Sequence, residues 1–396
     1  MTEADPAPDR LDRSRPSIAT VLLEWGRIGC IGFGGPPTHI RMLRELCVDR
    51  KRWLRPVEFE DAVAACNLLP GPASTQLAIF CAWRVRGRIG AVVGGLAFIV
   101  PGLIVILALA ALFLGTPPRW VLAAGAGAGA AVAAVAVHAA SGLLPASWQR
   151  ARDAGRARRL RWAAYLIAGI LAAATVGPWV VVVLFACGAV ELTARVPRDT
   201  RPSAILPMPT LAVGAVSVGV LTSVAWVAFK VGALSYGGGF VIIPLMQADA
   251  VDRYQWMTSG QFLNAVALGQ ITPGPVVQTV AVVGYAAAGL TGGVLASAVA
   301  FGPSFALILL GARRFDELRA NASARAFLDG AGPAAIGAIA GSAISLARAL
   351  SEPWQYCVLA GASVMLFVLR RGVVPTLLAA AAAGVILAAA GLALPQ

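Results

Sequence analysis

Hydroxyl and amide side chains gather around two Pro-Gly-Pro sequences in an otherwise apolar chain. Such groups donate hydrogen bonds to an oxyanion without carrying a fixed charge. Proline and glycine interrupt a helix, and the helix that restarts after them presents N–H groups that favour anions. Hydrogen bonding between neighbouring helices is the alternative role. The predicted substrate contacts are Asn67, Pro70, Gly71, Pro72, Thr75 and Gln76 in the first sequence and Gln270, Pro273, Gly274, Pro275 and Gln278 in the second.

A further helix break lies upstream of each Pro-Gly-Pro sequence, so that the breaks form a second pair. The segments are "GFGGPP" at 32–37 and "SYGGGF" at 235–240. Single glycines and prolines often only kink or pack membrane helices. Two different breaks that recur in the same order favour a binding site instead, because transporters build their sites from broken helices in corresponding positions. We therefore add Gly34, Gly35, Pro36, Gly237 and Gly238 to the predicted substrate contacts.

Two cations, Arg27 and Lys230, occupy the same repeat position shortly before these breaks, two residues before Gly29 and Gly232. A charge buried in a membrane is costly and marks a functional site by default, so both are predicted to bind an anion. Each has a structural alternative. Glu24 lies one helical turn before Arg27 and would neutralise it, and Lys230 would extend to the membrane interface if it lay between two spans.

Candidates for proton coupling are Glu24 and His39, because carboxylates in spans often relay protons and histidine titrates near neutral pH. No catalytic triad, phosphate-binding loop or metal-ligand cluster is evident, and the "GAGAGA" at 125–130 fits small-residue helix packing. We expect no catalytic residue, metal or cofactor, and hence no enzyme.

The chain contains an internal duplication. Residues 28–78 align without a gap with 231–281, and sixteen of the 51 positions are identical, among them Pro-Gly-Pro, Val-Asp-Arg and a tryptophan. Shared apolar composition does not produce such identities. We predict a cytoplasmic tail at 1–16, a first repeat domain at 17–201 and a second at 202–396.

The composition is that of a polytopic helical membrane protein. Hydrophobic residues make up 58% of the 396 positions and charged residues 13%, and the mean hydropathy is +0.77. The net charge of +13 comes mostly from short basic segments between apolar runs, which is typical of cytoplasmic loops rather than of nucleic-acid binding. The six cysteines form no CxxC pair, and the polar N-terminus has no cleavable signal pattern.

About thirteen spans are predicted, with the N-terminus cytoplasmic and the C-terminus outside. The second half has one span more than the first, and this extra span inverts the second half relative to the first. In the first half the spans lie at 17–36, 62–83, 89–114, 119–144, 162–178 and 179–194. In the second, 209–246 holds two spans that meet near Lys230, followed by 262–285, 293–311, 327–347, 354–369 and 373–394. A re-entrant segment at 62–83 is the alternative that would change the side of 41–61.

The chain resembles the chromate ion transporter family over essentially its whole length. The resemblance is carried by "RIGCIGFGGPPTHI" at 27–40, "DRKRW" at 49–53, "NLLPGPASTQ" at 67–76 and the weaker second-half copies "KVGALSYGGGF" and "QITPGP". In the second half Pro36 is replaced by Gly239 and His39 by Ile242, so the first half is expected to determine substrate specificity. The resemblance implies export of chromate across a bacterial cytoplasmic (inner) membrane, driven by membrane potential or a proton gradient, and chromate resistance.

The sequence is also compatible with other functions. Sulfate has the charge and shape of chromate, so a sulfate-like oxyanion is the main alternative. A membrane-embedded enzyme lacks a visible catalytic cluster, and a passive anion channel fits duplicated broken helices less well than alternating access. The expected partners are the oxyanion and the lipid bilayer, with no nucleic acid, and a homo-oligomer is one option for the assembly.

Overall fold

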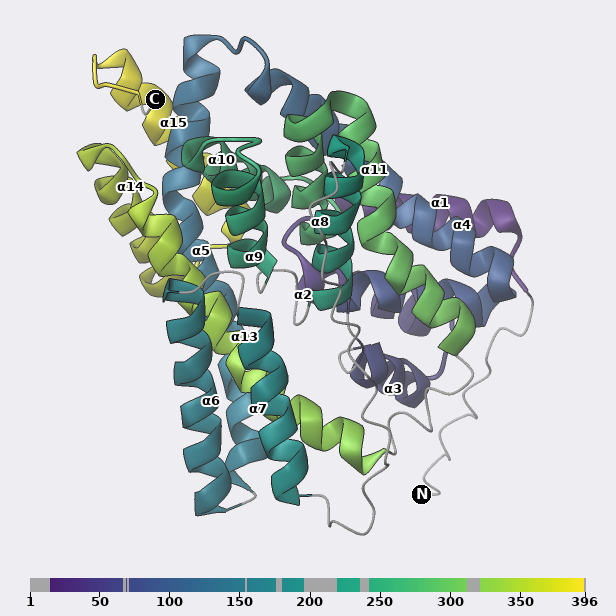
Figure 1. Cartoon of the computed structure of the whole chain (residues 1–396). Coiled ribbons are helices and arrows are strands. Elements are labelled where there is room, and N and C mark those ends of the chain that lie inside the picture. Colours follow the sequence, from purple (N-terminus) through teal and green to yellow (C-terminus); the bar gives the residue numbers. More distant parts are fainter. Residues whose placement is uncertain are drawn as a thin grey trace, which may run out of the picture.

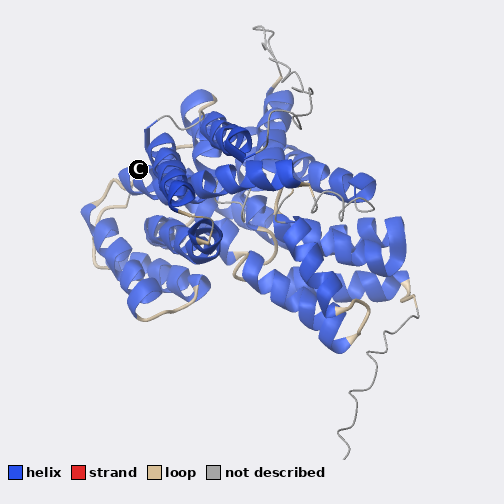
Figure 2. Ribbon diagram, turned by 90° about the horizontal axis from the view of Figure 1, so that it is seen from below, coloured by secondary structure: helices blue, strands red, loops and turns tan. Residues whose placement is uncertain are grey.

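The computed structural model describes residues 15–66, 69, 71–153, 155–175, 180–195, 219–235, 242–311 and 321–394, and these residues form helices without a strand (Figures 1 and 2). The first half contains α1 (Ile18–Ile31), α2 (Pro36–Arg44), η1 (Glu45–Arg50), α3 (Pro56–Cys66), α4 (Ala73–Leu114), α5 (Arg119–Arg152), α6 (Arg156–Thr175) and α7 (Val180–Arg195). The second contains α8 (Val220–Leu234), α9 (Ile243–Gln247), η5 (Ala248–Arg253), α10 (Ser259–Ile271), η6 (Val276–Gln278), α11 (Thr279–Gly311), α13 (Ala322–Arg348), α14 (Pro353–Ser363), η8 (Val364–Val368) and α15 (Val373–Ala389). The predicted all-α class is confirmed.

The duplicated sequence folds into duplicated local structure. The π-helical turns η1 and η5 occupy equivalent positions in the two halves. Two residues after each turn ends, the chain has a residue with positive φ, Arg52 at 49° and Gln255 at 52°. The following tryptophans close the turns in the same way, since the Trp53 N–H donates to Cys47 O and the Trp256 N–H donates to Ala250 O, both at 2.8 Å. These turns position the helices that lead into the two Pro-Gly-Pro sequences.

The long helices α4 and α11 are helical hairpins. In α4 the dihedral angles leave the helical region at Arg86 and Gly87, and a methyl group at Gly94 would lie 2.5 Å from the Ala82 Cβ. In a straight helix these two residues would be separated by roughly 18 Å, so the chain turns back on itself. In α11 the same reversal occurs at Ala288 and Gly289. Both reversals fall between spans that the sequence predicts.

The two halves are interleaved away from the hairpins α4 and α11, where helices of one half pack between helices of the other. The second-half helix α13 packs against α6 and α7, whereas α14 and α15 pack against the first-half helix α5 (Figure 1). Glycines allow the backbones to approach closely, as is usual between membrane helices. A methyl group at Gly127 of α5 would lie 2.2 Å from Ala380 O of α15, and one at Gly337 of α13 would lie 2.0 Å from Leu166 O of α6. Neither half therefore packs alone.

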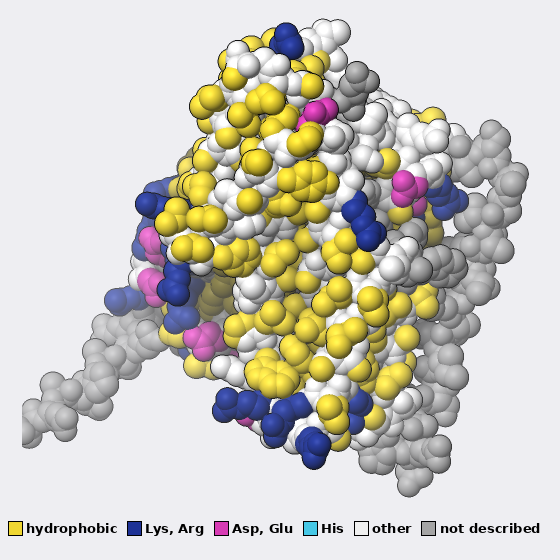
Figure 3. Space-filling model, turned by 90° about the vertical axis from the view of Figure 1, so that its left-hand side faces the viewer, with side chains coloured by type: hydrophobic (Ala, Val, Ile, Leu, Met, Phe, Trp, Pro, Cys, Tyr) yellow, Lys and Arg dark blue, Asp and Glu magenta, His cyan; other side chains and the backbone are white. Residues whose placement is uncertain are grey.

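The surface has the character expected in a bilayer. Figure 3 shows a broad hydrophobic face with lysines and arginines gathered at its edges. Among the described residues, four helices are long and apolar enough to cross a membrane, at Ala73–Leu114, Arg119–Arg152, Val276–Gly311 and Ala322–Arg348. Leu23 and Leu310 are 72% and 82% exposed, which fits contact with lipid tails.

Several predicted spans have different boundaries in the structure. Span 17–36 ends at Ile31, because the glycines after it leave the helical region, and span 62–83 is divided into α3 and α4 at the Pro-Gly-Pro sequence. The predicted boundary between two spans near Lys230 is wrong, since this residue lies inside α8. The total of about thirteen spans stays a prediction, because residues 196–218 and 312–320 lie outside the described part of the chain.

A cluster of ion pairs joins α13 to α6 and α7. The Asp329 carboxylate accepts hydrogen bonds from Arg158 Nη2 at 2.5 Å and Arg195 Nη1 at 2.9 Å. Glu191, whose side chain is 1% exposed, accepts from Arg161 Nε at 2.7 Å and Arg195 Nε at 2.5 Å. Because Asp329 belongs to the second half and all three arginines to the first, this cluster connects the two halves at their basic end.

Replacing Asp329 by asparagine should destabilise the protein. The change leaves Arg158 and Arg195, whose side chains are only 17% and 27% exposed, with one anionic partner fewer, at a cost of roughly 1–3 kcal/mol. We expect a lower melting temperature of the purified protein in detergent, followed by loss of the monodisperse size-exclusion peak. Asp153→Asn is the control, because the Asp153 side chain is 77% exposed. Equal melting temperatures for the two variants would contradict the structural role of the cluster.

Candidate anion-binding site at the crossing of the two broken helices

The first break reverses the chain at the end of α1. The helix is capped by Gly32, whose N–H donates to Ile28 O at 2.8 Å, and Gly34 and Gly35 follow with φ of 96° and 72°. The next helix, α2, begins with Pro36 and Pro37, which have no N–H, and the Thr38 and His39 N–H groups donate to Gly35 O. The start of α2 therefore offers little to an anion, in contrast to the role predicted for Gly34, Gly35 and Pro36.

Each Pro-Gly-Pro loop is hydrogen-bonded to the break in the other half. The Gly71 N–H donates to Ser235 O at 2.8 Å, and the Gly274 N–H donates to Gly32 O at 3.0 Å. Gly71 and Gly274 occupy equivalent positions in the duplication, as do Gly32 and Ser235. This reciprocal arrangement is what a pseudo-two-fold relationship between the halves produces. We call these four residues the loop crossing.

Side chains tighten the crossing from both halves. A methyl group at Gly102 of α4 would lie 2.1 Å from Pro273 O and 2.6 Å from Gln278 Oε1. The Gln278 amide nitrogen donates to Ile99 O at 2.6 Å. On the opposite side, a methyl group at Gly71 would lie 3.1 Å from Ser304 Oγ of α11. Each loop thus rests on the second arm of the other half's hairpin.

The polar residues predicted around the loops are buried here. Thr75, Gln76 and Gln278 are 0% exposed, and Gln270 is 7% exposed. Buried polar groups normally find a hydrogen-bond partner. Several atoms at the crossing have none among the described residues, namely Thr75 Oγ1, Ser235 Oγ, Gln270 Nε2, Gln278 Oε1 and Ser304 Oγ. Such unpaired groups are the kind that a bound oxyanion or water would satisfy.

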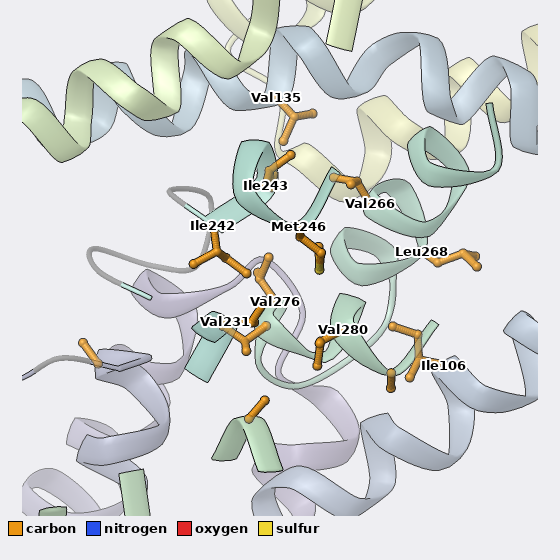
Figure 4. Packing of buried hydrophobic residues seen from close by; sticks show 14 of the residues in the cluster. Ile106, Val135, Val231, Ile242, Ile243, Met246, Val266, Leu268, Val276 and Val280 are labelled. Carbon is orange, nitrogen blue, oxygen red and sulfur yellow. The ribbon is translucent and has the colours of Figure 1, made fainter. Parts of the chain in front are cut away.

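Apolar side chains surround this polar cluster. Figure 4 shows valine, isoleucine, leucine and methionine side chains from both halves packed around Val276, the residue that follows the second loop. In so apolar an environment each hydrogen bond to a ligand is stronger than in water, and each unmade one costs more. The residues labelled in Figure 4 include Val231, Ile242, Ile243, Met246, Val276 and Val280.

His39 lies at the crossing in the first half only. Its Nε2 is 2.9 Å from Gly32 O, and its Nδ1 is 3.3 Å from Ser74 Oγ. A side chain at position 32 would meet the His39 ring at 2.9 Å. In the second half Ser235 replaces Gly32 and Ile242 replaces His39.

The structure does not bring the two predicted cations together at the crossing. Arg27 is exposed on the outer face of α1, because Trp25, Ile28 and Gly29 form the buried face. The Glu24 carboxylate lies 3.5 Å from both Arg50 and Lys51, and no ion pair between Glu24 and Arg27 occurs in the described residues. The structural alternative, in which Glu24 neutralises Arg27, is therefore wrong.

Lys230 is paired with a carboxylate that the sequence analysis missed. Its amine forms an ion pair with Asp249 of η5, and the two side chains are 16% and 5% exposed. The amine also lies 5.8 Å from the centre of the Trp226 ring. The aligned residue of the first half is Leu46, so the repeat comparison alone does not point to Asp249.

Some predicted contacts cannot be placed. Asn67, Pro70, Gly237 and Gly238 lie outside the described residues. Among the residues that are described, no group of three histidine, cysteine, aspartate or glutamate side chains is arranged to hold a metal ion. Ser235 and Ser304 were missed by sequence reasoning. Ser235 has a signal in hindsight, because it is the residue that aligns with Gly32 of the first break.

The fold and the crossing define an all-helical membrane protein of two repeats, built around broken helices as in secondary transporters. A family model described as chromate transporter matches residues 19–192 and again residues 222–388, and the chain belongs to this family. The two matches agree with the duplication found in the sequence.

Curated relatives carry the same description. The chain is 31% identical to the chromate transport protein of Cupriavidus metallidurans over 84% of this chain and 83% of the relative. It is 30% identical to the chromate transport protein of Pseudomonas aeruginosa over 89% and 84% of the two chains. A probable chromate transport protein of Synechococcus elongatus is 29% identical over 81% and 82%. No solved structure matches the chain.

Replacing Gly102 by alanine should disrupt the crossing. The added methyl group would lie 2.1 Å from the Pro273 carbonyl, so the second loop must move. We expect transport to fall at least about tenfold and the melting temperature to drop, as for overpacked sites. Gly302→Ala is the matched control, because this α11 glycine has no atom within 4 Å of an added methyl group. The same behaviour in both variants would show that the close approach is unimportant.

Neutralising Lys230 alone should cost more than removing the whole ion pair. Lys230→Met leaves the nearly buried Asp249 carboxylate without a partner, a loss of roughly 3–5 kcal/mol. The double variant Lys230→Met/Asp249→Leu removes both charges and should regain the melting temperature and transport. A double variant that folds normally but does not transport would instead show that transport itself needs the Lys230–Asp249 pair.

Proposed function

We propose that this protein exports chromate, a dianionic oxyanion, across the cytoplasmic membrane of a bacterium and thereby confers chromate resistance. The observation that carries the proposal is a buried crossing of two broken helices, lined with unpaired hydroxyl and amide groups, in a chain of the chromate transporter family. The names of the curated relatives support chromate as substrate. Hydrogen-bond donors without a carboxylate among them suit an anion.

The membrane potential suffices to drive export. At about 100 mV, negative inside, outward movement of a dianion gains roughly 2 × 2.3 kcal/mol. Uptake of the same ion would need coupling to more than two positive charges. A secondary transporter driven by the potential, or by a proton gradient, therefore fits outward transport.

The orientation follows from the basic residues. We place the N-terminus and the arginine cluster of α5, α6 and α7 in the cytoplasm, and the C-terminus outside. Arg150, Arg158, Arg161 and Arg195 all belong to this cluster. The second half is then inverted relative to the first. The domain limits 17–201 and 202–396 are part of the proposal.

Of the two candidates for proton coupling, His39 has the better position. It is buried and hydrogen-bonded to Gly32 O, which also accepts the Gly274 N–H of the crossing. A change in its protonation therefore acts directly on the contact between the halves. Glu24 lies in an ion pair with Arg50 and Lys51 at the edge of the fold, which favours a structural role for its carboxylate.

Sulfate or a related tetrahedral oxyanion is the alternative substrate, because neutral hydrogen-bond donors respond to charge and shape that chromate and sulfate share. An enzyme is disfavoured by membership in a transport family. A passive channel is disfavoured by the close packing at Gly71 and Gly102, where each loop lies directly against a helix of the other half rather than lining an open path.

The test is uptake of radiolabelled chromate into everted membrane vesicles, in which export appears as accumulation. We expect concentrative uptake that collapses when the potential is clamped to zero and that excess sulfate inhibits only weakly. Vesicles without the protein are the control, and a protonophore applied at clamped potential separates proton coupling from the electrical drive. Absence of accumulation, or faster transport of sulfate than of chromate, would overturn the proposed function.

A further inference from the structure

The two Pro-Gly-Pro loops occupy equivalent positions in the duplication but differ in the hydrogen bonding of the side chains around them. At the first loop, three buried hydroxyls have no partner among the described residues: Thr75 Oγ1, Ser235 Oγ and Ser304 Oγ. All three residues are 0% exposed. A hydroxyl buried without a partner costs free energy, and three such groups around one loop indicate that a ligand accounts for them.

These hydroxyls come from three elements that meet at Gly71. Thr75 lies in the first turn of α4, which starts directly after the loop. Ser235 caps the end of α8, and its carbonyl accepts the Gly71 N–H at 2.8 Å. Ser304 belongs to α11, with its Oγ 3.1 Å from where a Gly71 side chain would begin. The N-terminus of α4 adds the positive end of a helix dipole, which favours negative charge, although the Thr75 and Gln76 N–H groups already donate to Pro72 O at 3.0 Å.

At the second loop Gln278 stands in place of Thr75 and Gly32 in place of Ser235, and the nearby threonine hydroxyls are already used. The Thr279 hydroxyl donates to Val276 O at 2.9 Å and the Thr272 hydroxyl donates to Leu268 O at 2.8 Å. The Gln278 amide nitrogen donates to Ile99 O, which leaves its oxygen, an acceptor, unpaired. One free donor remains there, Gln270 Nε2. An oxyanion only accepts hydrogen bonds, so a bare amide oxygen repels it.

From this difference we infer that the transported oxyanion binds at the first loop, through the hydroxyls of Thr75, Ser235 and Ser304 together with the start of α4. The second loop serves to hold the halves together. The inference rests on the proposed function and narrows it to one of two equivalent positions. The ligand class is a tetrahedral oxyanion without its hydration shell, held by neutral donors.

The experiment is equilibrium binding of radiolabelled chromate to the purified full-length protein in detergent. Thr75→Val and Ser304→Ala each remove one hydroxyl at nearly constant volume, and we expect each to weaken binding about tenfold or more, the usual effect of losing a hydrogen bond to a charged group. Ser235→Ala should act in the same direction. Thr75→Ser retains the hydroxyl and should restore binding.

Matched controls remove hydroxyls that already have partners. Thr279→Val alters the first turn after the second loop, and Ser342→Ala alters a serine of α13 that is 0% exposed and donates to Ile339 O at 2.7 Å. Both should bind chromate within about twofold of the wild type. Gln270→Met tests the remaining free donor of the second loop, and the melting temperature of every variant reports whether it folds.

The outcomes separate the two proposals. Wild-type protein that binds neither chromate nor sulfate overturns the proposed function and this inference together. Wild-type binding that Thr75→Val and Ser304→Ala leave unchanged overturns the inference alone. Loss of binding in Gln270→Met or Thr279→Val, with normal binding in Thr75→Val, moves the anion to the second loop and also overturns it. If Thr75→Val fails to fold, chromate binding by Ser304→Ala and Ser235→Ala, each compared with binding by Ser342→Ala, still tests whether the anion binds at the first loop.

Discussion

Two reciprocal backbone hydrogen bonds, from Gly71 to Ser235 O and from Gly274 to Gly32 O, constrain the rest of this structure. In the apolar interior of a membrane protein every interrupted helix exposes backbone groups that need partners. Here each break satisfies a group of the other half. Gly71 and Gly274 adopt φ of 118° and 95°, which residues with a side chain rarely reach, so the glycine between the prolines is required by the backbone geometry itself.

The close packing around the crossing follows from those bonds. The helix ending at Gly32 has to approach α4, and a methyl group at Gly29 would lie 2.7 Å from Phe98 O. In the second half the contact recurs between Gly232 of α8 and Ala300 O of α11, at 2.0 Å. Since each bond joins opposite halves, any movement that separates the halves must give both N–H groups another acceptor. Movement and polar contacts at the crossing are therefore physically linked.

Sequence reasoning recovered the features that depend on backbone chemistry. The all-helical class, the duplication and the positions of the breaks follow from composition, from register and from glycine and proline. Sequence reasoning failed where the outcome depends on which neighbouring helix a side chain faces in the folded protein. Arg27 and Lys230 share one repeat position, yet Arg27 is exposed and Lys230 is paired with Asp249, because the partner comes from another element. The free hydroxyl of Ser304 was invisible for the same reason, since a single sequence does not tell which serine faces which loop, whereas Ser235 is marked only by its alignment with Gly32.

The side chains around the loop crossing differ between the two halves in several neighbouring positions at once, while the backbone hydrogen bonds are the same in both. His39 occupies space that a side chain at Gly32 would need, and in the other half Ser235 occurs together with Ile242. The ion pairs next to the first helix of each half are reversed in polarity, with Glu24 facing Arg50 and Lys51 in one and Lys230 facing Asp249 in the other. A backbone hydrogen bond places no demand on side-chain identity beyond the space it needs. The duplicated frame was thus free to keep its shape in both halves while the chemistry at its two loops became different.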